Sequence, residues 1–551
     1  MRDQERMESA GENKPLKRTN STPAKKNALL AMASAATIAL LLNTGGLAFA
    51  DEATSGSVAS ATVAAATLPD ATGTAVTVST AQELYDAIVN GTANIINVTG
   101  NIDMHDIGTA NTRVAIKNKR DITIQSADGT AYNVDFSGYS FTMGADPTVT
   151  TRNLTLNGAN YWGMVQGATT YNFENVTYIG SQLVNSDVGA VNFYGSVNST
   201  SVISYTNPIS GKSYSTQGGG NQQVIEGKTA NFKAGSTVVL ATEAGNVLQL
   251  ESGGDGVNIE SGANVTLSPR TAKSPEGVKY TRAWGIVASG AEVNIASGAT
   301  LNIDIAEQQS GDLNQSGAVY LDSSAKINVN EGGTFNITSS GTWGSLANSS
   351  GPVYLTGSGA QINVGKNATF KFAASNTGTY AGNLLYLAGG ASINANPYST
   401  FEVSADGTGA LSALRTAGSS TINVDQPTLF KVDLTQNTNK TNAKLVYAGT
   451  VNVSHSKQIF SDGGESEPIN NLVITYSNGS ASIANTQAAL ESLTSDGEQT
   501  IRDNIVGKTQ DSLIFTRAGE TVDLVDDQLS LSAENVLTGK VAVADGNNED
   551  V

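Results

Sequence analysis

Charged side chains that could act on polysaccharides are concentrated in one part of the sequence. A lyase or hydrolase acting on sugars requires paired carboxylates, or a bound cation together with a base. The aspartates could hold calcium while an Arg or Lys acts as the base. Most of them fall at expected strand ends and turns, where Asp is common for conformational reasons. The residues concerned are Asp103, Asp106, Asp121, Asp128 and Asp135, with Arg113, Lys117, Lys119, Arg120 and Arg152.

Few other residues offer metal binding or nucleophilic chemistry. The chain has 2 histidines and no cysteine, and His105 and His455 lie far apart, outside any metal-binding spacing. The segment GGDG at residues 253–256 is similar to a calcium-binding repeat, but it departs from that pattern and occurs once. We interpret it as a turn. The sequence therefore predicts no catalytic residue, no metal site and no cofactor.

Aromatic side chains offer a different chemistry, because their rings can stack on sugar rings. The candidates are Tyr161, Trp162, Trp284 and Trp343. Aromatic residues in strands and long turns are more often partly buried than displayed to a ligand. Burial is therefore the favoured interpretation, and sugar stacking is the alternative.

A recurrent asparagine is the most regular polar feature of the chain. Each copy stands between two apolar residues, so its side chain should face outward from a strand. Stacked repeats would let these amides bond to one another as a ladder. The alternative is a groove that binds sugar hydroxyls, but a site needs few residues whereas a ladder needs one per repeat. The positions are Asn258, Asn294, Asn328, Asn363, Asn394, Asn423 and Asn452, at spacings of 36, 34, 35, 31, 29 and 29 residues.

The segments around these asparagines repeat a unit of three short strands. GAVYLDSSAKINVNEGGTFNI begins at Gly317, and GPVYLTGSGAQINVGKNATFKF begins at Gly351. Strands this short cannot form a separate core, but stacked repeats can pair in parallel and share one core. A propeller would need longer units. We therefore predict an all-β, parallel β-helix solenoid over residues 76–455, with Ile327, Val329, Ile362 and Val364 pointing inward.

The two ends of such a solenoid must be covered. The capping box at residues 80–83 predicts a short helix over about 81–89, followed by a strand at 95–98. Residues 456–551 are expected to form a C-terminal cap or small module. Within it the pattern predicts a strand at 472–476 and helices at about 486–493 and from Ser495.

The first fifty residues are typical of a secretory signal peptide. A basic segment precedes an apolar run from Ala28 to Leu42, and Ala48-Phe49-Ala50 provides a cleavage site. The small, polar residues 51–75 are expected to form a flexible linker.

The charge balance limits the classes of partner. The chain carries 31 basic and 49 acidic residues, for a net charge of −18. Removing residues 1–50, with 7 basic and 4 acidic residues, leaves 24 against 45 and a net charge of −21. So acidic a chain argues against nucleic acid and anionic membrane surfaces as partners, and we expect no membrane span after signal removal.

The region from Val76 to about Asn452 resembles the pectate-lyase-like adhesive domain of Gram-positive surface proteins. The residues that carry the resemblance are VSTAQELYDAI from Val78, IINVTGNID from Ile95, and later coils with the pattern A-x-I-N-V. The resemblance implies a right-handed β-helix on secreted or wall-associated proteins that mediate adhesion. Motifs of polygalacturonases and lyases are not found in this region.

These observations favour a secreted cell-surface protein that binds host, matrix or glycan ligands and has no catalytic activity. The alternative is a polysaccharide lyase or glycoside hydrolase with an unrecognised site. A rigid stalk is a third possibility. A shared fold does not decide between them.

Overall fold

The computed structural model describes eleven segments of the chain, all of which belong to one compact unit that begins at Thr62. They are residues 64–108, 112–144, 146–185, 189–217, 223–250, 255–271, 283–305, 316–339, 351–483, 495–506 and 511–518. The signal peptide, the helix expected at 486–493 and Trp343 lie outside them. The described residues are mostly β-strands, which confirms the all-β class, and no described helix has the length and apolarity of a membrane span.

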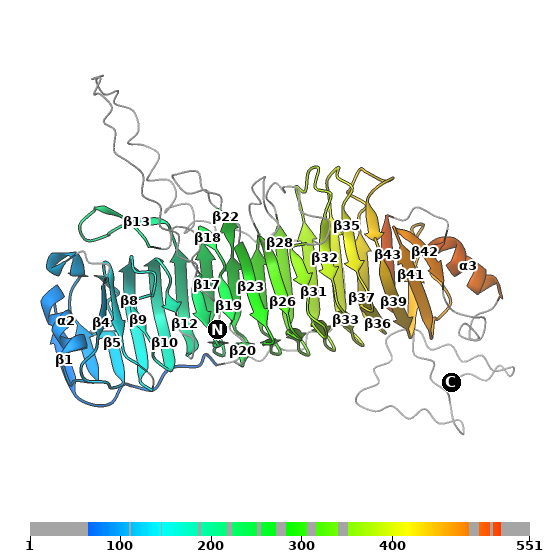
Figure 1. Cartoon of the computed structure of the whole chain (residues 1–551). Helices are drawn as coiled ribbons and strands as arrows, with labels where there is room; N and C mark the ends of the chain where they lie inside the picture. The colour runs from blue at the N-terminus through cyan, green and yellow to red at the C-terminus, as the bar shows by residue number, and fades with distance from the viewer. Residues whose placement is uncertain are drawn as a thin grey trace, which may run out of the picture. The chain divides into compact units, whose positions relative to one another are not determined.

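The strands form three stacks, in which each strand pairs in parallel with its equivalent in the next coil (Figure 1). The first stack holds β1 (Ala75–Val78), β2 (Ile95–Val98), β5 (Ile122–Ser126), β16 (Thr229–Phe232), β20 (Gly256–Ile259), β24 (Glu292–Ile295), β27 (Lys326–Val329), β30 (Gln361–Val364), β33 (Ser392–Ala395), β36 (Thr421–Asp425) and β39 (Gly449–Ser454). The second stack holds β3 (Ile102–Asp103), β6 (Tyr132–Asp135), β17 (Thr237–Thr242), β21 (Asn264–Ser268), β25 (Thr300–Asp304), β28 (Thr334–Ser339), β31 (Thr369–Ala374), β34 (Thr400–Ala405) and β37 (Leu429–Asp433). Three long strands, β8 (Thr148–Gly158), β10 (Thr170–Gly180) and β12 (Ala190–Ser201), run through both stacks and join them into one sheet.

The third stack is a separate nine-stranded sheet. It consists of β11 (Val184–Asn185), β15 (Ile225–Gly227), β19 (Leu248–Leu250), β23 (Ala283–Ser289), β26 (Ser316–Asp322), β29 (Val353–Leu355), β32 (Asn383–Leu387), β35 (Ser412–Thr416) and β38 (Lys444–Val446). A three-stranded sheet of β4 (Thr112–Ala115), β7 (Tyr139–Thr142) and β9 (Val165–Gln166) belongs to the earlier coils. Two small antiparallel pairs are β13 (Ser204–Thr206) with β14 (Ser213–Ser215), and β18 (Ala244–Gly245) with β22 (Arg270–Thr271).

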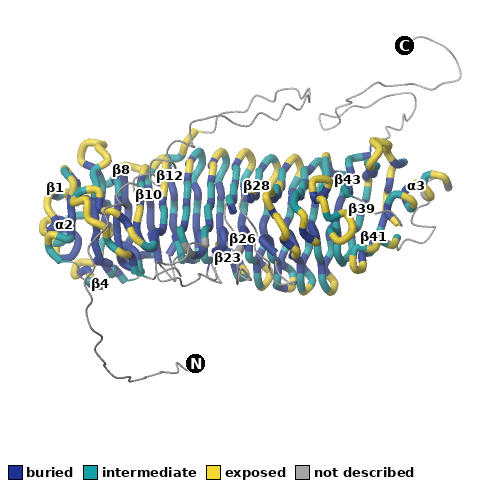
Figure 2. The backbone as a smooth tube through the Cα atoms, turned by 90° about the horizontal axis from the view of Figure 1, so that it is seen from above, coloured by how far each residue is buried: buried dark blue, intermediate teal, exposed yellow. Residues whose placement is uncertain are grey.

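The core lies between the stacks, where apolar residues alternate with outward polar ones (Figure 2). Ile327, Ile362 and Val364 are each 0% exposed and Val329 is 1% exposed, so all four predicted inward positions are confirmed. Because the pairing register aligns equivalent residues of successive coils, phenylalanines of the second stack lie one above another. Successive ring centroids from Phe335 through Phe370, Phe401 and Phe430 lie 5.3, 4.9 and 5.1 Å apart.

The predicted asparagine ladder is confirmed. In each coil the Nδ2 of one asparagine donates to the Oδ1 of the equivalent asparagine in the preceding coil, at 2.6–3.2 Å from Asn294 to Asn452. The ladder also extends to earlier coils through Asn258, Asn231 and Asn192 to Asn172. These amides therefore satisfy one another, as an architectural role requires.

The N-terminal end is covered by α2 (Ala81–Val89), whose capping box links Thr80 and Glu83 as predicted. Leu84 and Ile88 are buried against the first coils. Ahead of β1, the described part of the expected linker is bonded to the coils. The Ala66 amide donates to the Ala234 carbonyl at 2.8 Å, and the Leu68 amide donates to Glu174 at 3.2 Å. This part of the chain is not the free linker that its small, polar composition suggested.

The C-terminal residues continue the first two stacks with reversed direction. The strand β41 (Leu472–Ser477) pairs antiparallel with β39, and it is followed by β42 (Ser480–Ile483) and α3 (Ser495–Ile505). The strand β43 (Ser512–Arg517) pairs antiparallel with both β37 and β40 (Ser456–Ile459). These strands cover the edges of β39 and β37, the arrangement expected of a cap.

Candidate functional site

A row of four tyrosines and one arginine runs along the third stack, half-buried except for Tyr386, which is 8% exposed. We name it the tyrosine column: Tyr320, Tyr354, Tyr386, Arg415 and Tyr447. Tyr320 faces outward because its neighbours Val319 and Leu321 are each 0% exposed in the core.

The register of the third stack places these side chains one above another. Tyr320 pairs with Tyr354, Tyr354 with Tyr386, and Tyr386 with Arg415. The tyrosine ring centroids are 5.5 and 5.4 Å apart. The Arg415 guanidinium carbon lies 5.5 Å from the Tyr386 ring centroid and 4.6 Å from that of Tyr447, within cation–π range. Trp284, one of the predicted sugar-stacking residues, lies 5.6 Å from Tyr320 but is only 3% exposed.

A shallow pocket of about 470 Å³ opens at the Arg415 end of the tyrosine column. We name it the basic pocket, because among the residues that the structure describes its lining has two cations and no carboxylate. Its walls are Ala381, Asn383, Ala410, Ser412, Arg415, Asn442, Lys444, Tyr447 and Asn478. Amides and a hydroxyl beside two positive charges are groups that recognise polar and anionic ligands.

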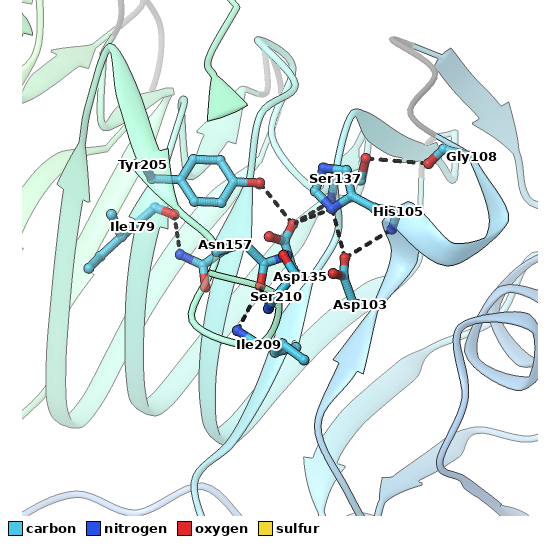
Figure 3. Close-up of polar contacts among 12 residues, drawn as sticks. Asp103, His105, Gly108, Asp135, Ser137, Asn157, Ile179, Tyr205, Ile209 and Ser210 are labelled. Carbon is cyan, nitrogen blue, oxygen red and sulfur yellow. Dashed lines mark hydrogen bonds and ion pairs between the residues drawn. The ribbon is translucent and has the colours of Figure 1, made fainter. Parts of the chain in front are cut away.

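A second site lies at the N-terminal end, where the structure brings together three of the residues singled out in the sequence (Figure 3). We name Asp103, His105 and Asp135 the Asp–His cluster. Asp103 and Asp135 are register neighbours on β3 and β6. Asp103 also caps η1 (Met104–Ile107), so that the His105 Nδ1 lies 2.7 Å from the Asp103 Oδ1 and 3.9 Å from the Asp135 Oδ1. Ligand atoms of all three residues lie within 4.8 Å of one another, a spacing that could hold a metal ion.

The pair β13–β14 covers the Asp–His cluster. The Tyr205 hydroxyl donates to the Asp135 Oδ1 at 2.8 Å, and the Tyr214 ring stacks on the His105 ring with centroids 3.7 Å apart. Asp135 is 0% exposed, and the His105 side chain is 9% exposed. The Asp135 Oδ2 is buried without a hydrogen-bond partner among the described residues. The cluster can share a proton or hold a cation, but its cover restricts access by a polysaccharide.

Burial raises the pKa of the Asp135 carboxyl, and the nearby Asp103 raises it further. Hydrogen bonds from Ser137 and Tyr205 and the charge of His105 act in the opposite direction. The raised pKa means that the folded protein binds this proton more tightly than the unfolded chain does. The resulting stabilisation is complete below the unfolded pKa of about 3.9 and is lost as the pH rises through the folded pKa.

We therefore expect Asp135→Asn to become more stable relative to the parent as the pH rises from about 4 to about 7. Thermal unfolding midpoints across this range measure the trend. Asp128→Asn is the matched control, since hydrogen bonds from Thr130 hold the pKa of Asp128 low. Its stability relative to the parent should change mainly below about pH 4 and stay nearly constant from about 4 to about 7. A constant difference between Asp135→Asn and the parent would contradict the assignment.

The other predicted carboxylates and cations do not join the cluster. Asp121 accepts the Thr148 amide at 2.7 Å, and Asp128 closes a turn with Thr130. Arg120 donates to the Ala87 carbonyl at 2.6 Å, at the end of α2. Asp106, Arg113, Lys117 and Lys119 are exposed. Asp121, Asp128 and Arg120 therefore have local structural roles.

The remaining candidates also have local partners. Arg152 is buried with its Nε 3.0 Å from Glu174. The exposed His455 lies 2.9 Å from Asp425. Arg113 lies 4.8 Å from the half-buried Trp162 ring, and Tyr161 packs edge-on against Trp162. Of the GGDG segment, Asp255 and Gly256 are described, and the Asp255 amide donates to Thr229 at 3.1 Å.

The comparisons with known proteins bear on the first coils. Residues 75–185 match the family model of the pectate lyase-like adhesive domain. This match confirms the resemblance to the adhesive domain from β1 to β11. The same range contains the Asp–His cluster. The tyrosine column lies beyond the matched residues of the adhesive domain. No match was found among the curated proteins.

Two solved structures are similar to this chain. The first is the L. reuteri 100-23 SRRP, with 21% sequence identity and a TM-score of 0.43, matched over 64% of this chain and 99% of that one. The second is the L. reuteri 53608 SRRP, with 18% identity and a TM-score of 0.36, matched over 59% of this chain and 97% of that one.

Proposed function

We propose that this chain is a secreted, adhesin-like surface protein of a Gram-positive bacterium that binds extracellular ligands and catalyses no reaction. Its three parallel stacks form a right-handed β-helix over residues 76–455. The observation that carries the proposal is the tyrosine column, in which the half-buried rings of Tyr320 and Tyr354 and the buried ring of Tyr386 repeat along the third stack at spacings of 5.4–5.5 Å. The match of residues 75–185 to an adhesive domain and the signal-like N-terminus support it.

The alternative, a polysaccharide lyase or glycoside hydrolase, is favoured by one observation. The Asp–His cluster combines an imidazole, two carboxylates and the Tyr205 hydroxyl, and such groups serve as acids and bases in sugar cleavage. The buried Asp135 and the Tyr214 ring over His105 argue against it, because a general acid or base must reach its substrate.

The test uses the purified chain from residue 51 to residue 551. We expect saturable binding to immobilised mucin, matrix proteins or glycan arrays, strengthened when many copies share one surface. We expect no unsaturated ends from polygalacturonate with calcium, and no new reducing ends from neutral glycans.

Turnover that is lost in Asp135→Asn, with Asp121→Asn as the control, would overturn the proposal and establish the enzyme. If the chain shows neither binding nor turnover, a structural stalk remains as its role.

A further inference from the structure

The basic pocket has the opposite sign to the rest of the chain. The sequence carries a net charge of −18, whereas the described residues of the pocket lining include Arg415 and Lys444 and no carboxylate. The two cations come from adjacent coils, because Ser412 on β35 pairs with Lys444 on β38. A locally positive charge on an otherwise acidic chain attracts an anionic group to this pocket and not to the rest of the surface.

The tyrosine column holds the Arg415 side chain in place. Its guanidinium lies between the rings of Tyr386 and Tyr447, at 5.5 and 4.6 Å from their centroids. An arginine ordered by stacking loses little freedom when it binds a carboxylate or sulfate. The pocket is therefore organised before a ligand arrives.

The rest of the lining suits sugar hydroxyls. The exposed Asn442 and Asn478 contribute amides, groups that both donate and accept hydrogen bonds. The half-buried rings of Tyr354 and Tyr320 continue from the pocket along the stacking direction. Aromatic rings there can pack against the apolar faces of sugars.

We propose that the basic pocket binds a single anionic sugar, carrying a carboxylate or a sulfate ester, at the end of an otherwise neutral glycan. The neutral sugars lie along Tyr354 and Tyr320, whose rings are half-buried, whereas Tyr386 is only 8% exposed. Because the whole chain is strongly acidic, a polymer with a negative charge on every sugar is repelled. This inference rests on the proposed function and names the ligand class for it.

The experiment compares three soluble oligosaccharides that share one neutral backbone: uncharged, ending in a carboxylated sugar, and ending in a sulfated sugar. Calorimetry with the chain 51–551 should give at least about tenfold tighter binding for one or both charged probes, as expected for a charge-assisted hydrogen bond. Whichever charged probe binds more tightly shows whether the pocket prefers a carboxylate or a sulfate. Polygalacturonate should bind more weakly per sugar than the favoured probe.

Arg415→Gln and Lys444→Gln should each weaken binding of the charged probe about tenfold and leave the neutral probe within about twofold. Lys371→Gln is the control, because Lys371 is an exposed cation on the second stack, 2.8 Å from Glu402. Unchanged thermal midpoints establish that the variants are folded.

Equal binding of neutral and charged probes, or tighter binding of polygalacturonate, would overturn the inference. So would full binding by Arg415→Gln and Lys444→Gln. If all glycans fail but mucin or matrix proteins bind, this inference fails and the adhesin remains. If no ligand of any class binds, the proposed function fails as well.

Discussion

Ile362→Asp is expected to lower the free energy of unfolding by about 4 kcal/mol or more. Ile362 is 0% exposed and is paired in register with Ile327 in one neighbouring coil and Ile393 in the other, so the new carboxylate would be buried against aliphatic side chains without a partner. Urea and thermal unfolding measure the loss.

Gln361→Asp is the matched control, because Gln361 precedes Ile362 on β30 and is only half-buried. Its cost should stay within about 0.5 kcal/mol. Parent-like unfolding of Ile362→Asp would show that the inward register of β30 is wrong.

Gly256→Ala should destabilise the protein by about 3 kcal/mol. Gly256 has a φ of +76°, and an added Cβ would lie 1.9 Å from the carbonyl oxygen of Glu292 in the next coil. The substitution therefore combines a left-handed backbone with a clash that only a shift of the coil can relieve. Thermal unfolding measures its effect.

Gly418→Ala separates these two causes. Gly418 has a φ of +65°, but no atom of the described residues lies within 4 Å of an added Cβ, so its cost should be about 1–2 kcal/mol. Equal effects of the two substitutions would contradict the close approach at Gly256.

The GGDG segment at residues 253–256 is interpreted as a turn and not as a calcium site. A rise in the parent's thermal midpoint on adding calcium, abolished by Asp255→Asn, would contradict that interpretation.

The stacking could be predicted from the sequence because each repeat carries its own register. The triplets around Asn328 and Asn363 place an apolar residue on either side of the amide, so alternation alone assigns their faces. The capping box at Thr80 is equally local. These features need only neighbouring residues, and the structure confirms them.

The candidate sites depend on contacts that local patterns do not encode. Asp103 and Asp135 meet because β3 pairs with β6, and Tyr205 reaches them from 70 residues further along. The tyrosine column had a signal, the outward middle residue in V-Y-L at Tyr320 and Tyr354. The next position in the row is occupied by Arg415, which pairs with Tyr386. A cation does not match an aromatic repeat, so the sequence pattern did not reveal that the row continues.

The stacking of coils also determines how the chain extends under tension. Adjacent strands are bonded at about 4.8 Å, whereas a coil of 29 residues reaches about 100 Å when it is pulled straight. A force along the stacking direction loads the bonds between the outermost coil and its neighbour first. Once the capping strands β41 and β43 have detached, Asn452 leaves Asn423 while the bond from Asn423 to Asn394 is still intact. The molecule lengthens in discrete steps, each absorbing work, and the coils behind the break keep their shape.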